Sequence, residues 1–106
     1  MRLRSSGVDV AGKRPKHLEW SVRAAHDILT IDLYLSVENP NAARDVVEYI
    51  VRRAEQLRRF PFLGRPTGGG RPRKLVLARY PYNIHYRLTA SRVRIVRVLH
   101  QARRLP

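Results

Sequence analysis

Histidine and arginine side chains near the C-terminus are the groups of this sequence best suited to chemistry. His85, Arg87 and His100 lie within one short stretch. An imidazole exchanges protons readily near neutral pH, and a guanidinium can hold a phosphate through two parallel hydrogen bonds. The set therefore points to phosphodiester chemistry. The simpler interpretation is that His85 is exposed on a polar strand face, in phase with Asn83 and Arg87, and that His100 is a structural histidine.

Other kinds of site find little support. The sequence has no Cys, which excludes a disulfide framework, zinc-finger spacing and a thiol nucleophile. Its four His show no paired spacing on one element, so we predict no metal site, and no motif calls for a cofactor. Gly68-Gly69-Gly70 lacks the Lys-Ser/Thr pair of a phosphate-binding loop and is interpreted as a flexible link.

The charge of the chain is strongly asymmetric. Its 106 residues include 22 Lys and Arg against 8 Asp and Glu, a net charge of +14, and residues 61–106 hold 11 of the bases and no acid. Such a charge must be met by an anionic partner or tolerated as self-repulsion, and the partner could be a nucleic acid, an acidic protein or a membrane surface. The absence of acids also leaves no carboxylate base in that half.

Length and composition favour one cytoplasmic domain. A chain of 106 residues with 43% hydrophobic and 28% charged residues is typical of a single globular domain. No apolar stretch approaches the roughly 20 residues of a membrane-spanning helix, and no secretory signal is present. Residues 1–15 follow no sustained period and are predicted to be a basic flexible leader, which leaves residues 16–106 as the domain.

Two amphipathic segments predict a helical hairpin. A short strand at residues 17–20 precedes Ser21, which is a suitable N-cap for a helix over residues 22–37. Asn39 caps a second helix that begins at Pro40, and Phe60-Pro61 ends it. Because only two or three residues separate the helices, they should pack antiparallel.

After a Gly- and Pro-rich loop at residues 61–72, the hydrophobic period changes to two. This alternation predicts strands over residues 74–79, 82–88 and 92–99. The last strand is apolar on both faces and is expected at the centre of the sheet, with Val93, Ile95 and Leu99 on one face and Val96 and Val98 on the other. The predicted fold is α+β, in the order β-α-α-β-β-β, with the antiparallel hairpin packed on a C-terminal antiparallel meander.

Four motifs along the chain occur together in one known superfamily. They are Asn39-Pro40-x-Ala42-Ala43, Phe60-Pro61-x-x-Gly64-Arg65-Pro66, Tyr80-Pro81-Tyr82-x-Ile84-x-Tyr86-Arg87, and Val93-x-Ile95-x-Arg97-Val98-Leu99-His100-x-x-Arg103. Over about residues 17–104 the chain resembles the RelE/ParE superfamily, the toxins of type II toxin–antitoxin modules. The resemblance implies a growth-inhibiting toxin, associated with plasmid stabilization, that a cognate antitoxin neutralises.

One branch of the superfamily, the RelE-like toxins, cleaves messenger RNA on the ribosome with a set of mostly basic residues. Of five positions, Lys74 and Arg103 match that set; a second lysine falls on Val76, an arginine falls on Asn83, and the last tyrosine falls beyond Pro106. A rebuilt ribonuclease site would consist of Lys74, His85, Arg87, His100 and Arg103. The departures favour a protein that is not an enzyme.

The other branch, the ParE-like toxins, poisons DNA gyrase by binding. The Phe-Pro-x-x-Gly-Arg-Pro and Val-Leu-His-x-x-Arg segments resemble this branch, which we prefer. The predicted target-binding residues are Arg79, Arg87, Arg97, His100, Arg103 and Arg104. A plain nucleic-acid-binding module is the last alternative, because both predicted helices carry acids and neither is suited to base recognition.

A small basic toxin calls for an acidic antitoxin. We expect an antitoxin segment that folds on binding, attracted by charge and held by apolar burial in the groove between the helical hairpin and the sheet. The predicted antitoxin-binding residues are Trp20, Leu29, Leu33, Val47, Arg65 and Arg73.

Overall fold

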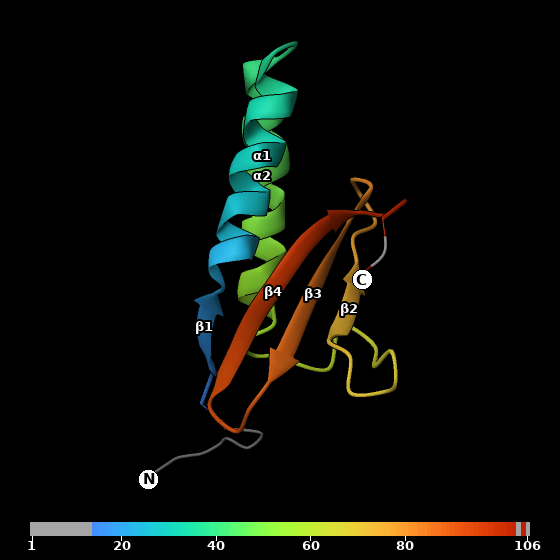
Figure 1. Cartoon of the computed structure of the whole chain (residues 1–106). Coiled ribbons are helices and arrows are strands. Elements are labelled where there is room, and N and C mark those ends of the chain that lie inside the picture. Colours follow the sequence, from blue (N-terminus) through green and yellow to red (C-terminus); the bar gives the residue numbers. More distant parts are fainter. Residues whose placement is uncertain (1–13, 104, 106) are drawn as a thin grey trace, which may run out of the picture.

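Two helices pack on one face of a four-stranded sheet in the computed structural model, which describes residues 14–103 and Leu105 (Figure 1). The elements are β1 (His17–Trp20), α1 (Val22–Ser36), α2 (Pro40–Gln56), β2 (Arg73–Val76), β3 (Tyr82–Leu88) and β4 (Arg92–His100). The predicted α+β class and the order β-α-α-β-β-β are confirmed. Most of the predicted leader (its first thirteen residues) lies outside the described residues, and so does Arg104.

Both helices begin where the sequence places a capping side chain. The hydroxyl of Ser21 accepts the backbone N–H of Ala24 at 3.0 Å, and Oδ1 of Asn39 accepts that of Ala42 at 3.1 Å. These bonds satisfy N–H groups that the first turn of a helix leaves free. The second helix ends at Gln56, four residues before Phe60, and a turn connects the two positions.

The last strand lies inside the sheet, as predicted. The strand order is β1-β4-β3-β2, so β4 lies between β1 and β3. Strand β1 pairs parallel with β4, from His17 opposite Arg92 to Trp20 opposite Ile95, whereas the other two pairings are antiparallel. In Figure 1 the hairpin runs beside β1 and β4, and its tip extends beyond the sheet.

Beyond the end of β1, the start of helix α1 lies beside β4. Strand β1 stops at Trp20, and Ser21 then donates its N–H to the carbonyl of Ile95 at 2.9 Å and its hydroxyl to that of Val96 at 2.8 Å. Six residues after Ser21, Oδ2 of Asp27 accepts the N–H of Val98 at 2.9 Å. Polar groups of β4 that no strand pairs are thus satisfied by the start of the helix.

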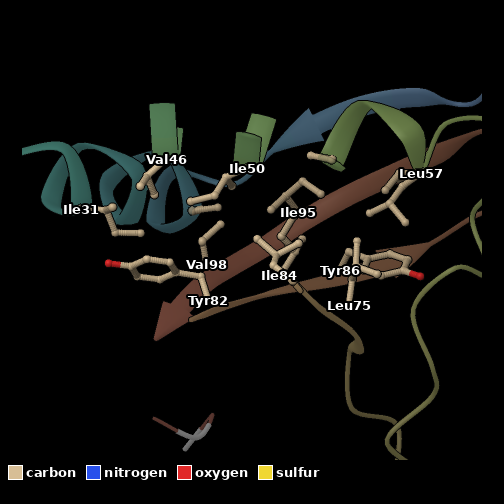
Figure 2. Packing of buried hydrophobic residues seen from close by; sticks show 14 residues of the cluster. Ile31, Val46, Ile50, Leu57, Leu75, Tyr82, Ile84, Tyr86, Ile95 and Val98 are labelled. Atoms are coloured by element: carbon tan, nitrogen blue, oxygen red, sulfur yellow. The ribbon is translucent and has the colours of Figure 1, made fainter. Parts of the chain in front are cut away.

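The core fills the space between the hairpin and the sheet. Figure 2 shows Ile31, Val46, Ile50 and Leu57 facing the side chains of the sheet. The sheet contributes buried side chains from three strands, namely Leu75, Tyr82, Ile84, Tyr86, Val93, Ile95 and Val98. Figure 2 shows Val98 beside Tyr82, and both belong to this core.

A β-bulge changes which residues of β4 face the core. Tyr86 pairs with Ile95 and His85 pairs with Arg97, so Val96 has no partner on β3. The alternation of faces therefore shifts by one residue after Val96. Val98 joins the core, whereas Leu99 pairs with Asn83 on the opposite face, so the predicted grouping of Leu99 with Val93 and Ile95 was wrong.

Tyr86 anchors the loop that follows the second helix. Its hydroxyl donates to the carbonyl of Pro61 at 2.7 Å and accepts the N–H of Gly64 at 2.9 Å. A Cβ at Gly64 would lie 2.8 Å from the carbonyl oxygen of Lys74 and 2.8 Å from that hydroxyl. The Phe-Pro-x-x-Gly-Arg-Pro motif thus has a structural cause, because only glycine fits between Tyr86 and β2.

Candidate functional site

The sheet face that the helices leave uncovered, here called the outer face, carries the residues predicted for phosphodiester chemistry. Lys74 of β2 pairs with His85 of β3, so their side chains lie on the same face of the two strands. A cavity of about 260 Å³ opens there between the sheet, the loop after α2 and the C-terminal segment. Its lining residues are Thr67, Arg71, Lys74, Asn83, His85, Gln101, Arg103 and Leu105, and we call this cavity the basic pocket.

The structure brings together three of the five residues of the predicted ribonuclease site. Lys74, His85 and Arg103 line the basic pocket. Arg87 instead donates from Nη1 to the carbonyl of Gly70 at 2.7 Å, and Nδ1 of His100 accepts the N–H of Ala102 at 3.1 Å. Arg87 and His100 therefore form hydrogen bonds with backbone groups and do not line the pocket.

His85 is buried, and the prediction that it is exposed was wrong. Only 5% of the residue is accessible. Strand alternation places it on the outer face correctly, but the loop before β2 and the C-terminal segment fold over that part of the face. Burial lowers the pKa of His85, and the nearby charges of Lys74 and Arg97 lower it further, while Asp27 opposes them. The ring is therefore neutral at neutral pH.

Two buried polar side chains of the pocket lack partners. Among the described residues, neither ring nitrogen of His85 has a hydrogen-bond partner, and neither does Oδ1 of Asn83. Asn83 is 5% exposed, like His85. Buried polar groups are nearly always satisfied in folded proteins, so two together mark a place where a ligand or water is expected.

The predicted target-binding residues divide into two groups. Arg79, Arg87, His100 and Arg103 are exposed on the surface. Arg97 is only 8% exposed, and its guanidinium donates from Nε and Nη2 to the two carboxylate oxygens of Asp27, at 2.8 and 3.0 Å. This hydrogen bond raises the pKa of Arg97. The guanidinium is therefore bound inside the protein and is not presented at the surface.

The hairpin itself carries an open groove. A groove of about 600 Å³ lies between the two helices, and all its lining residues come from them: Ala25, Ile28, Leu29, Asp32, Ser36, Pro40, Arg44, Val47 and Glu48. We call it the hairpin groove. Leu29 and Leu33 are 53% and 60% exposed, and Tyr34 and Val37 at the tip are exposed further still.

The position expected for the antitoxin segment, between the hairpin and the sheet, stays a prediction. The core fills the centre of the space between the hairpin and the sheet, and at its rim His26 and Asp27 of α1 and Arg97 of β4 line an open cavity of about 510 Å³. Of the predicted antitoxin-binding residues, Leu29 and Val47 line the hairpin groove and Leu33 lies exposed on α1. Trp20 packs against the core instead.

The two arginines of that set hold the loop. Arg73 donates from Nη2 to the carbonyl of Gly64 at 2.7 Å, and its guanidinium lies over the ring of Phe62, 5.1 Å from its centre. Arg65 is exposed, and its backbone pairs with that of Lys74.

Sequence reasoning missed several residues of these surfaces. The alternation in β3 placed Asn83 beside His85, and this signal could have paired them in one site. Nothing local in the sequence indicates that Thr67, Arg71 and Gln101 meet there, because loop and tail residues are brought in by the tertiary fold. The partner of Arg97 was equally hidden, since Asp27 lies 70 residues away.

Comparisons with known proteins relate this chain to one family of toxins. A family model described as "ParE toxin of type II toxin-antitoxin system, parDE" matches residues 18–105. The protein named "Putative toxin Y4kP" from Sinorhizobium fredii is 35% identical over 91 residues, which cover 86% of this chain and 94% of that protein. A solved structure described as "Chromosomal ParDE TA system from P. aeruginosa" matches with a TM-score of 0.72 and 27% identity, over 83% of this chain and 98% of the other. None of the helices within residues 14–103 is long and apolar enough to cross a membrane.

Proposed function

This chain belongs to the ParE toxin family of type II toxin–antitoxin systems, and on that basis we propose that it arrests growth by poisoning DNA gyrase until a cognate acidic antitoxin neutralises it. The action is binding, with no bond made or broken by the toxin. The pairing of a toxin with its antitoxin in the ParDE system of P. aeruginosa supports the partner.

The hairpin groove is the observation that carries the antitoxin proposal. Half-exposed leucines such as Leu29 line or flank an opening large enough for side chains of a partner helix or strand. Burying them against a partner removes apolar surface from water, which favours association. The net charge of +14 would speed the approach of an acidic segment. The occupant is therefore an acidic segment with apolar side chains on one face.

The gyrase proposal draws its support from the exposed cations of the β2–β3 turn and the C-terminus. Arg79 and Arg103 are exposed, whereas Arg97 is held by Asp27. Among the residues lining the basic pocket none is acidic, so a carboxylate base for RNA cleavage is missing there. These features fit a toxin that holds its target rather than one that cuts RNA.

A supercoiling assay tests the target. Purified chain, added to gyrase and relaxed plasmid with ATP, should block supercoiling and leave cleaved DNA when the reaction is stopped with detergent. Arg79→Gln and Arg103→Gln should each weaken the inhibition, and Arg59→Gln, at an exposed arginine in the turn after the second helix, should not. Addition of the cognate antitoxin should restore supercoiling.

Three results would each remove a part of the proposal. Growth arrest with unaffected gyrase would exclude gyrase as the target. New messenger RNA ends in phase with codons, found by primer extension after induction, would place the chain with the ribonuclease branch. No arrest of growth on induction would exclude a toxic action altogether.

A further inference from the structure

We propose that the basic pocket on the outer face is a binding site for a single phosphate group. The site is separate from the hairpin groove, and the inference does not depend on gyrase being the target. It rests on the placement of three cations, on the absence of acids around them, and on the two unpartnered buried side chains described above.

Three cations from different parts of the chain converge on the pocket. Lys74 comes from β2, Arg71 from the loop before it, and Arg103 from the segment after β4. Arg71 follows a turn of three glycines, Gly68-Gly69-Gly70, with φ angles of 84°, 59° and 71°. Only glycine adopts these angles without strain, so the turn that presents Arg71 depends on its sequence.

The same turn is fastened to the sheet. Arg87 on β3 donates to the carbonyl of Gly70 at 2.7 Å, and Thr67 donates its hydroxyl to the carbonyl of Pro72 at 2.9 Å. The glycine segment, which the sequence suggested was a flexible link, therefore has a defined position beside the pocket. A preorganised cation loses less entropy when it binds an anion.

No carboxylate opposes an anion at this place. The lining residues that the structure describes include no Asp or Glu, and residues 61–106 contain none. Asp27, the acid that affects His85, already binds Arg97 and the N–H of Val98. Three cations and no lining carboxylate give the pocket a positive potential that attracts an anion from outside.

The unpartnered side chains fit the chemistry of a phosphate. A neutral imidazole has one N–H donor and one acceptor nitrogen, and the carboxamide of Asn83 can turn to present its NH₂ group. A phosphate offers acceptor oxygens and, near neutral pH, a proton. At about 260 Å³ the pocket is smaller than the roughly 300–1,000 Å³ of sites for drug-sized molecules, which suits one small group rather than a whole nucleotide.

An NMR titration of the labelled full-length chain with inorganic phosphate, at constant ionic strength, tests the proposal. We expect saturable shifts in the signals of Lys74, His85 and Arg103. Lys74→Gln and Arg103→Gln should each weaken binding about tenfold, as expected when one charge-assisted hydrogen bond is lost. Arg92→Gln removes an exposed arginine of β4 that does not line the pocket, and it should change the affinity less than about twofold.

The phosphate source is distinguished by three further probes. Thymidine monophosphate carries a terminal phosphate, the dinucleotide thymidylyl-thymidine carries a backbone phosphate, and thymidine carries none. Tighter binding of the first indicates free nucleotides or strand ends, and tighter binding of the second indicates a nucleic-acid backbone. In either case the pKa of His85, read from its ring signals, should rise when phosphate is bound, because an anion favours the charged imidazole.

Several results would overturn the site. They are no saturable shift, equal binding of thymidine and its phosphate, or an equal loss from Arg92→Gln and Lys74→Gln, which would indicate diffuse charge alone. Because Lys74 and Arg103 are not buried, their variants should fold. Circular dichroism and an unchanged Tm establish this before binding is compared.

Discussion

Asp27 of helix α1 and Arg97 of the central strand β4 form a bidentate ion pair that is almost completely buried. Their side chains are 11% and 10% exposed. The same carboxylate accepts the N–H of Val98, so one acid satisfies both an arginine and the free edge of β4. The pair thereby links the acid-containing half of the sequence to the acid-free half.

Removing Asp27 should therefore destabilise the fold strongly. Asp27→Ala leaves a buried arginine without its partner, which costs about 3–5 kcal/mol in other proteins. The free energy of unfolding, from urea denaturation followed by circular dichroism, measures this loss. The double variant Asp27→Ala/Arg97→Met should recover part of it, because the unpaired charge is gone.

Glu19→Ala provides the matched control. Glu19 pairs with Arg94 at 3.2 Å between two strands, but their side chains are 39% and 48% exposed. Water screens such a pair, and its loss should cost less than about 1 kcal/mol. If the two single variants lose the same stability, the Asp27–Arg97 pair has no special structural role.

Tyr86→Phe should loosen the loop after the second helix. The variant keeps the buried ring but leaves the N–H of Gly64 and the carbonyl of Pro61 without their bond to the hydroxyl. A buried group left unsatisfied costs about 1–3 kcal/mol. Thermal unfolding should show a lower Tm, whereas Tyr34→Phe, at a residue 75% exposed, should not change it. An unchanged Tm for Tyr86→Phe would mean that the loop is held by other contacts.

Gly64→Ala should be destabilising through crowding alone. The new Cβ would meet the carbonyl oxygen of Lys74 and the ring of Tyr86 at 2.8 Å, and overpacking of this kind costs about 1–3 kcal/mol. Gly69→Asn is the control, because that position has open space and asparagine tolerates a positive φ. Urea denaturation compares the two, and a smaller loss for Gly64→Ala than for Gly69→Asn would contradict the crowding.

His85 should make stability depend on pH. Its pKa is lowered in the folded chain from the ordinary 6.5, so between the two values the unfolded state binds more protons. Stability then rises with pH and is lost on acidification from about 6.5 down to the folded pKa. Urea denaturation in phosphate-free buffer from about pH 8 to 5 should show a shallower loss for His85→Gln. Equal slopes for His85→Gln and the parent chain would exclude His85 as the cause.

The antitoxin should depend on the hairpin groove. Leu29→Asp and Leu33→Asp place charges on the apolar surface of α1 and should weaken binding of the cognate antitoxin by at least about tenfold, a loss of about 1.4 kcal/mol or more. Isothermal calorimetry of the complex measures the affinity. Leu63→Asp, at a leucine 47% exposed in the loop after α2, should leave it unchanged. Equal affinities for all variants would place the antitoxin elsewhere.

Local signals in the sequence determine most of the elements but not how their faces are covered. The alternation from Tyr82 to Leu88 gives the bounds of β3 correctly, and Ser21 and Asn39 give the starts of both helices. The predicted strand from residue 74 to 79 is shorter in the structure, where β2 covers Arg73–Val76. Its later residues turn toward the next strand.

Two errors share a non-local cause. The bulge opposite His85 and Tyr86 reverses the faces of Val98 and Leu99, and it arises from the pairing of two strands rather than from either one. The burial of His85 depends on a loop and a C-terminal segment that come from different parts of the chain. The hydrophobic period of one segment carries no information on strand pairing or on the segments that cover a sheet face. Capping hydrogen bonds span only a few residues, so the local sequence can predict them.

The parallel pairing of β1 with β4 has a consequence for synthesis. Strand β1 is synthesised before the other strands and β4 after them, yet the two are neighbours in the sheet. The buried side chains of the helices pack against those of β4. On the ribosome the emerging chain therefore has no partner for its first strand and no central strand for its helices until translation has passed His100. Both surfaces therefore depend on the last strand, because the basic pocket includes side chains of the segment after β4 and the hairpin groove lies on helices that pack against it.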